Sequence, residues 1–324
     1  MTKTKKQQLQ LDVGSAVDKD MYYMACSFIH SEEPHTRLFF YQHKNKDKWF
    51  YHDLPGWTVV STAFPPHQHI ENRKIYALSS EGDVECFSRN LITKEKISDA
   101  GIKTPGKNYG YLSTIRFISD TLYACGHRGQ VYKKTENGWA HFDDDLLQPP
   151  IELDIYSNIP LEEQVSASLK QTISLSDING HKNNIYTIGH RGFIAHHDGI
   201  RWKKLKKITA ADLYGIHSTP DGTWLVGANG TLLYGDAIKG FKVLNRKSTN
   251  ADFYSATRFN DSIYISASDG IYEYRNNNLT KLKIHAQEVS CIEEKDGVVW
   301  ALSSDKLLRY DGNSWEEFRH IDNL

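Results

Sequence analysis

Two histidine–arginine pairs are the first candidates for chemistry in this sequence. His127-Arg128 and His190-Arg191 stand at the same place in two copies of one octet, Leu122–Gly129 (LYACGHRG) and Ile185–Gly192 (IYTIGHRG). Such pairs could bind an anion or pair with acidic residues. They could equally be plain turn residues that are copied with the repeat. No further ligand stands at a fixed spacing from either histidine, so the pairs predict no metal site.

Known catalytic motifs give no sharper candidate. The sequence has no P-loop, no GxGxxG after a strand, no CxxC and no GxSxG. His67-Gln-His69 is only a weak metal signal. We therefore predict no catalytic residue, no cofactor and no metal. A catalytic site built from residues far apart in the sequence stays open.

An acidic segment follows the first of the two octets. Between Thr135 and Leu169 the chain carries eight acidic residues and no lysine or arginine. Local negative charge in an otherwise neutral protein attracts a cationic partner and speeds its association. The alternative is a solvated rim whose apolar residues hold the segment against the protein's own surface. The predicted partner-binding residues are Asp143, Asp144, Asp145, Glu152, Asp154, Tyr156, Glu162 and Glu163, with His127, Arg128, His190 and Arg191.

The octet itself indicates the fold, because looser copies of it recur along the whole chain. Each copy places apolar residues before a small polar or glycine tip, as in Thr223–Gly230 (TWLVGANG) and Ile263–Gly270 (IYISASDG). This pattern predicts a strand, a tight turn and a second strand. Seven copies are present, and the later ones recur at about 36–40 residues, which is the length of one propeller blade.

A seven-bladed β-propeller of four-stranded antiparallel blades follows from this count. It forms one domain over residues 1–324, and its ring closes without borrowing a strand from the other terminus. The approximate blades are 8–55, 57–98, 110–145, 171–208, 211–247, 251–284 and 287–320, with an insertion at 146–170.

The repeats resemble those of seven-bladed propellers of the WD-repeat-like and two-component-regulator-propeller kind. The octets carry this likeness together with Gly199-Ile-Arg-Trp202 and Gly312-Asn-Ser-Trp315, which precede outer strands. The Trp-Asp and Gly-His signatures of true WD repeats are missing, so their internal hydrogen-bond network is not implied. The resemblance implies a fold and no particular activity.

Extra residues gather on one face of the predicted ring. They lie at 29–36, 99–110 and 146–170, in loops that leave a blade on the same side. Loops of this length are usually functional or disordered. We expect a binding surface there, and a short helix over Pro160–Leu169 with acidic residues in its first turn.

The overall composition limits the class of partner and the compartment that we expect. Thirty-nine basic and forty acidic residues leave a net charge of −1, which disfavours nucleic acid and membranes as partners. The N-terminus lacks the apolar core of a secretory signal, and no apolar run is long enough to span a bilayer. All four cysteines fall in predicted strands, where we expect free, buried thiols. The cytoplasm is the expected compartment, although secretion without a leader stays open.

These observations favour a non-catalytic protein that binds another protein through the face with the insertions. An inhibitor or immunity-type protein that caps a basic effector, such as a nuclease toxin, is the concrete form of this hypothesis. The alternative is a hydrolase or lyase that acts on a carbohydrate in the central channel. A sensor or assembly scaffold is a third possibility.

Overall fold

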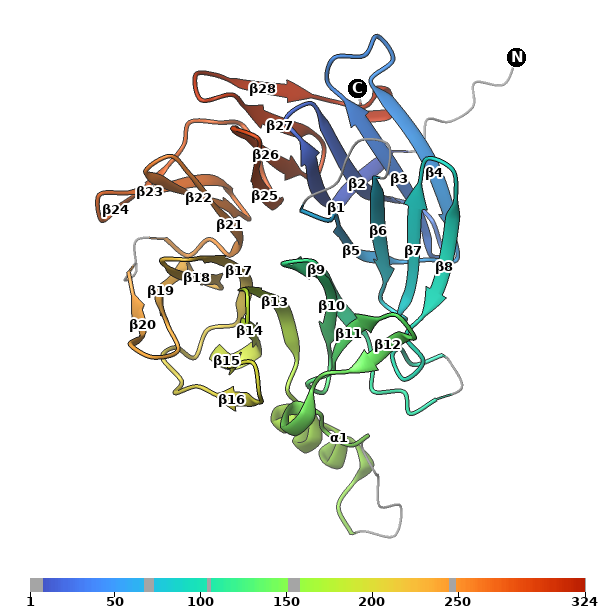
Figure 1. Cartoon of the computed structure of the whole chain (residues 1–324), viewed down its shortest axis with the longest axis vertical. Coiled ribbons are helices and arrows are strands. Elements are labelled where there is room, and N and C mark those ends of the chain that lie inside the picture. The colour runs from blue at the N-terminus through green and yellow to red at the C-terminus, as the bar shows by residue number, and fades with distance from the viewer. Residues whose placement is uncertain (1–7, 67–72, 104–105, 151–157, 245–248, 324) are drawn as a thin grey trace.

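Each octet forms the second strand of a four-stranded sheet, and the sheets are arranged as blades around a central channel (Figure 1). The computed structural model describes residues 8–66, 73–103, 106–150, 158–244 and 249–323. Within these residues, every sheet takes its four strands from one continuous piece of chain. The predicted seven-bladed, all-β propeller is confirmed.

The first four blades contain the longest strands and the main helical insertion. Blade 1 is β1 (Leu9–Asp18), β2 (Met21–Phe28), β3 (His35–Gln42) and β4 (Trp49–Pro55). Blade 2 is β5 (Val59–Ala63), β6 (Lys74–Ser79), β7 (Asp83–Ser88) and β8 (Ile92–Lys96). Blade 3 is β9 (Leu112–Ile118), β10 (Thr121–Gly126), β11 (Val131–Thr135) and β12 (Gly138–His141). Blade 4 is β13 (Leu175–His181), β14 (Asn184–Gly189), β15 (Phe193–His197) and β16 (Trp202–Lys204).

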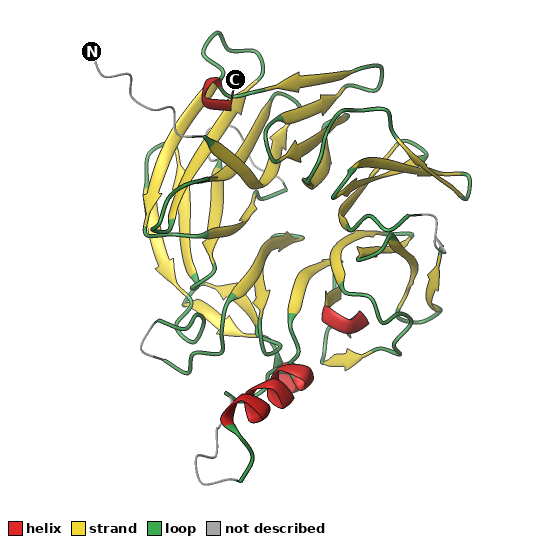
Figure 2. Cartoon of the chain, turned by 180° about the vertical axis from the view of Figure 1, so that it is seen from behind, coloured by secondary structure: helices red, strands yellow, loops and turns green. Residues whose placement is uncertain are grey.

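The last three blades are more regular. Blade 5 is β17 (Leu213–Thr219), β18 (Gly222–Gly227), β19 (Thr231–Asp236) and β20 (Gly240–Val243). Blade 6 is β21 (Phe253–Phe259), β22 (Ser262–Ala267), β23 (Gly270–Arg275) and β24 (Asn278–Lys281). Blade 7 is β25 (Val289–Lys295), β26 (Val298–Ser303), β27 (Leu307–Tyr310) and β28 (Trp315–Phe318). The helical segments are η2 (Asp144–Leu146), α1 (Leu161–Gln171), η3 (His190–Gly192) and η4 (Ile321–Asn323), as Figure 2 shows.

The apolar core lies between neighbouring blades. Seven clusters of buried residues occupy the seven blade interfaces of the described chain, one cluster at each. Burial of both faces of every sheet explains the long apolar runs in the octet strands. Cys26 and Cys125 are buried free thiols, as expected, whereas Cys86 and Cys291 are only half-buried.

Blades 7 and 1 close the ring through side-chain packing and single hydrogen bonds instead of a shared sheet. The Trp300 indole N–H donates to the Asp18 carbonyl over 3.0 Å, and its ring lies 5.6 Å from that of Tyr22. The Leu11 amide donates to the Ser304 carbonyl at 2.8 Å. The prediction that no strand is borrowed from the other terminus is therefore confirmed.

Candidate functional site

The insertion between blades 3 and 4 stands out from the ring, and its helix α1 lies beyond the outer strands (Figure 1). It leaves blade 3 after β12 and returns at β13, on the side where the turns between second and third strands also emerge. The expected short helix is present and begins at Leu161. This insertion-bearing face includes the tips of the octets in blades 3 and 4.

Left-handed backbone at the octet tips aims the two arginines at the insertion. Arg128 and Arg191 have φ values of 59° and 56°, and the glycine after each also has a positive φ. A Cβ at Gly129 would lie 2.2 Å from the Leu146 carbonyl oxygen, so only glycine fits there. In blade 5 the same turn carries Asn229, also left-handed at 55°. The turn itself therefore does not require arginine.

Arg128 holds the beginning of the insertion. Its Nη1 donates to the Pro149 carbonyl over 2.7 Å, and its own carbonyl accepts from the Gln148 amide at 2.8 Å. The residue is 9% exposed, and burial lowers the pKa of its guanidinium. Its hydrogen-bonding atoms thus serve the chain's own loop.

Arg191 holds the end of the insertion. Its Nη2 donates to the Thr172 carbonyl over 2.6 Å, and its Nη1 donates to the Leu169 carbonyl over 3.4 Å. These carbonyls lie at the C-terminal end of α1, where a cation is favoured by the helix dipole. Gln148 joins the two ends, because its Oε1 accepts from the Ile173 amide and its Nε2 donates to the Gln171 carbonyl.

The two histidines lie beside these arginines at the base of the insertion. The Nδ1 atom of His127 is 3.4 Å from the Ser174 hydroxyl, and the His190 amide donates to the Ser174 carbonyl. Burial lowers the pKa of His127, and Arg128 and His190 lower it further. The structure thus brings both predicted pairs to the same place. Both guanidinium groups donate to main-chain carbonyls there, and neither forms an ion pair with an acidic residue that the structure describes.

Asp143 differs from the predicted exposed rim of acidic residues. It is 3% exposed, and its Oδ2 accepts from the Val131 amide at 3.1 Å and contacts His141 Nδ1 at 2.9 Å. The other ring nitrogen of His141 lies 3.1 Å from Asp99. Burial opposes the charged imidazole, but the two carboxylates raise the pKa of His141 overall. The expectation of an exposed carboxylate is wrong at Asp143, because the end of blade 3 needs its hydrogen bonds.

Four of the other predicted acidic residues remain exposed. Asp144 and Asp145 lie on η2, and Glu162 and Glu163 lie in the first turn of α1. None of them forms an ion pair with any other described residue. We call these four residues the acidic patch. Glu152, Asp154 and Tyr156 lie outside the described residues.

The apolar residues of the insertion divide between the two roles considered for them. Leu146 is 1% exposed and packs in the core between blades 3 and 4, where it holds the insertion to the propeller. Leu161 and Leu169 are 48% and 50% exposed, and α1 has no buried residue. The helix therefore presents an apolar surface beside the acidic patch.

A further length excess lies on the opposite face. Residues 64–73 connect β5 to β6, between the first and second strands of blade 2. Lys295 of blade 7 reaches this connection and donates to the Pro66 carbonyl over 3.4 Å. His67 and His69 lie outside the described residues. The predicted length excesses, at 29–36, 99–110 and 146–170, did not include this connection.

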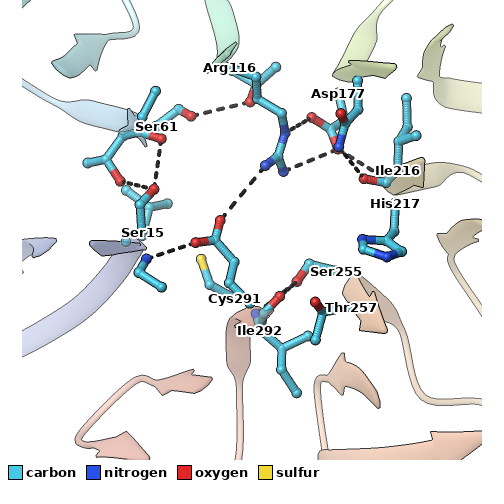
Figure 3. A pocket seen from close by; sticks show the side chains of 18 of the residues that line it. Ser15, Ser61, Arg116, Asp177, Ile216, His217, Ser255, Thr257, Cys291 and Ile292 are labelled. Carbon is cyan, nitrogen blue, oxygen red and sulfur yellow. Dashed lines mark hydrogen bonds and ion pairs between the residues drawn. The ribbon is translucent and has the colours of Figure 1, made fainter. Parts of the chain in front are cut away.

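The central channel contains polar residues from the first strand of every blade, and these residues close the ring (Figure 3). Ser61 bonds to the main chain of Ile115, Ser255 to that of Ile292, and His217 to that of Arg258. The corresponding contacts at the remaining junctions are Ser15–Thr62, Arg116–Asp177, Asp177–Ile216 and Glu293–Ala16. Each junction between blades thus has a polar contact beside its apolar cluster.

Three charged side chains meet inside this channel. Arg116 Nε donates to Asp177 Oδ1 over 2.6 Å, and its Nη1 lies 3.9 Å from Glu293. Burial raises the pKa of Glu293. The nearby Arg116 and the hydrogen bond that Glu293 accepts from the Ala16 amide oppose that shift. A cavity of about 380 Å³ remains around them. Polar side chains that line it, among them Ser61, Asp177 and Ser255, are occupied in contacts between blades.

The sequence carries a signal for this ring of polar residues. Polar residues alternate in first strands, as in Thr114-Ile-Arg116, Asp177-Ile-Asn179 and Ser255-Ala-Thr257. Such alternation places both polar residues on the channel side of the strand. Among the described residues, no group of three or more His, Cys, Asp or Glu side chains is placed to hold a metal ion. No described helix is long and apolar enough to cross a membrane.

Comparison with solved structures defines the class of protein as a seven-bladed propeller. Virginiamycin B lyase from Staphylococcus aureus, solved with quinupristin, has a TM-score of 0.66 and 12% identity, with 94% of each chain covered. The WD40 propeller domain of Doa1 has a TM-score of 0.62 and 12% identity over 98% of this chain and 96% of its own. YCF48 bound to a D1 peptide has a TM-score of 0.62 and 12% identity over 95% of this chain and 94% of its own. At such identity these structures share the fold alone.

One curated protein is similar in sequence as well. The chain is 25% identical over 269 residues to the immune protein Tsi7 of Pseudomonas aeruginosa, and the match covers 81% of this chain and 80% of that protein. No family model matches the chain.

Proposed function

We propose that this chain is a non-catalytic immunity-type protein that binds a protein effector through the insertion-bearing face. Its similarity to an immune protein along most of both chains is the observation that carries this proposal. A propeller suits the role because its rigid ring presents loops from several blades on one surface.

The geometry of the insertion supports the binding surface. Arg128 and Arg191 hold both of its ends, so the base of the insertion is ordered before any partner arrives. Preorganisation lowers the entropy that is lost on binding. The exposed Leu161 and Leu169 would contribute contact area, and burial of such residues at an interface centre usually dominates affinity.

The charge of the insertion indicates the chemistry of the partner. The acidic patch forms no ion pair within the described residues, so it favours a basic effector. Exposed charges of this kind accelerate association more than they slow dissociation. We place the interaction in the cytoplasm, where the four free cysteines would stay reduced.

Neutralisation of a toxic effector tests the proposal. The gene next to this one would be expressed in a sensitive host, alone and together with this chain, and growth would be compared. We expect toxicity that this chain suppresses, and a complex of the two purified proteins. A variant with Glu162→Lys and Glu163→Lys should associate at least about tenfold more slowly at low salt. Lys46→Glu with Lys283→Glu, two exposed lysines outside the insertion, is the control.

Two outcomes would contradict the proposal. Full suppression of toxicity by an unrelated propeller would show that the protection is not specific. A complex whose association rate is the same in the Glu162/Glu163 variant and in the wild type would place the effector elsewhere. A contact at the mouth of the channel would then be the next hypothesis.

A further inference from the structure

A cluster of unpaired cations lies on the outer edge of blades 4 and 5. It consists of Arg201, Lys204, Lys206, Lys207, Lys239 and Lys242, and all six residues are exposed. None of the six takes part in an ion pair with another residue that the structure describes. We call these residues the basic edge.

Edge protection does not account for the basic edge. Lysines on edge strands discourage pairing with other chains, and other blades of this propeller use them in that way. There, however, the cations are paired: Lys94 with Glu85, Lys96 with Asp83 and Lys281 with Asp269. The ladder partners of Lys204 and Lys242 are Ala195 and Tyr234, so no carboxylate lies opposite either of them.

Two isoleucines stand at hairpin tips beside these cations. Ile200 and Ile238 are 85% and 95% exposed. Both follow an aspartate, Asp198 or Asp236, whose carboxylate accepts hydrogen bonds from the two amides at the tip.

The matching turn of blade 7 shows that the isoleucines are not needed for the fold. There Asp311 makes the same pair of hydrogen bonds, and the tip residue is Asn313. The aspartate therefore builds the turn, and the tip side chain is free to vary. Isoleucine at both tips places apolar surface in water without any benefit to the turn itself.

The basic edge lies beside η2, which carries Asp144 and Asp145 of the acidic patch. Trp202 is the first residue of β16, and Phe142 lies just before η2. The Trp202 indole donates to the Phe142 carbonyl over 2.6 Å. Trp202 and Leu146 of η2 share one core cluster. The hairpin with Ile238 is joined to blade 4, because the Ala237 amide donates to the Tyr186 hydroxyl at 3.0 Å. Exposed aliphatic residues accompany both charged surfaces.

We propose that the occupant of this surface is a second copy of the chain, in a two-fold symmetric dimer. Adjacent patches of opposite charge are self-complementary about a two-fold axis that passes between them. The acidic patch of each copy then meets the basic edge of the other, and Leu161 and Leu169 pack against Ile200 and Ile238. Both contacts form at once, so the assembly closes at two copies.

This dimer does not depend on the proposed function, but it shares the acidic patch with it. A cationic effector and the second copy therefore compete for the same four carboxylates. Self-association is measured on the purified chain without any effector, so its failure leaves the proposed function untouched.

Sedimentation equilibrium of the full chain at low and high salt tests the dimer. We expect a mass of twice 37.1 kDa at low salt, and a dissociation constant at least about tenfold weaker between about 0.05 M and about 0.5 M NaCl. Lys204→Glu with Lys207→Glu should give a monomer, as should Glu162→Lys with Glu163→Lys. Ile200→Ser with Ile238→Ser should weaken the dimer about tenfold or more. Lys46→Glu with Lys283→Glu, which changes the net charge as much as the Lys204/Lys207 reversal does, should leave it intact.

Charge exchange makes the test specific. The chain that carries both the Lys204/Lys207 and the Glu162/Glu163 reversals should dimerise again, because each contact regains opposite charges. A mixture of the two separate reversal variants should form a heterodimer for the same reason. Circular dichroism of each monomeric variant checks that it is folded.

Three results would overturn the inference. They are a monomer at low salt for the wild type, a dimer that the reversals do not affect, and reversal variants that do not recover when combined. Binding of a DNA duplex or of anionic vesicles by the basic edge of a monomeric protein would assign the surface to phosphates instead.

Discussion

Arg116 of β9 and Asp177 of β13 form a hydrogen-bonded ion pair, with 2.6 Å between Nε and Oδ1, across the junction of blades 3 and 4. The same carboxylate accepts the amides of Ile178 and Ile216, so one side chain joins three neighbouring blades. Asp177 is only 2% exposed. The channel is therefore a structural element of the ring before it is a candidate for any other role.

Loss of this carboxylate should be costly. In Asp177→Ala the Arg116 guanidinium and two amides lose their acceptor inside the protein, which costs about 3–5 kcal/mol for a buried pair. Urea denaturation would measure the change. Ser176→Ala, one residue away and in no hydrogen bond that the structure describes, should cost less than about 0.5 kcal/mol. Equal effects of the two substitutions would refute the role of Asp177.

The three consecutive aspartates at the start of the insertion should separate by their burial. Asp143→Asn should destabilise the protein by about 1–3 kcal/mol, because a neutral amide replaces the carboxylate that makes charge-assisted hydrogen bonds with Val131 and His141. Asp144→Asn and Asp145→Asn should each stay within about 0.5 kcal/mol of the wild type. Thermal unfolding of the three variants checks this, and similar midpoints for all three would contradict it.

Arg191, which contacts the C-terminal end of α1, should contribute to the stability of the helix. Arg191→Ala removes two hydrogen bonds to helix carbonyls and a favourable charge near the C-terminus of the helix. We expect amide exchange in residues 158–171 to speed up about two- to fivefold, which corresponds to about 0.5–1 kcal/mol. Hydrogen exchange with mass spectrometry would detect it. Asn229→Ala, at the equivalent turn of blade 5, should leave exchange in α1 unchanged.

His217 should make the protein sensitive to acid. Burial lowers the pKa of its imidazole from the usual 6.5 to about 4, and Arg116 and Arg258 add to this shift. The neutral ring accepts a hydrogen bond from the Arg258 amide at 3.2 Å. Between pH 6.5 and about 4 the unfolded chain binds a proton at this site that the folded chain does not. Stability therefore falls as the pH falls through that window.

A comparison of the wild type with His217→Gln isolates this contribution. One group can change the free energy of unfolding by at most about 1.4 kcal/mol per pH unit. Glutamine keeps an acceptor but does not titrate, so its variant should lose less stability on acidification. Parallel pH profiles for the two proteins would show that His217 does not contribute.

The fold could be predicted from the sequence alone, because its determinants act between residues close in the chain. Each octet combines a strand pattern with a small polar or glycine turn, and those requirements act within about eight residues. The number of blades, the closure of the ring within single sheets and the position of α1 follow from this repetition. These features depend on interactions between residues close in the chain, and such interactions can be predicted from periodicity and from the residue types at turns.

Contacts between distant residues were decided only by the tertiary structure. The sequence presented Asp143, Asp144 and Asp145 as equivalent acids, yet Asp143 is buried by Val131 and His141 while its neighbours stay in water. The His-Arg pairs were expected to face a partner, but Arg128 and Arg191 hold the insertion through carbonyls that are about twenty residues away. Burial and hydrogen-bond partners depend on which blades lie side by side, and no spacing within one repeat encodes them.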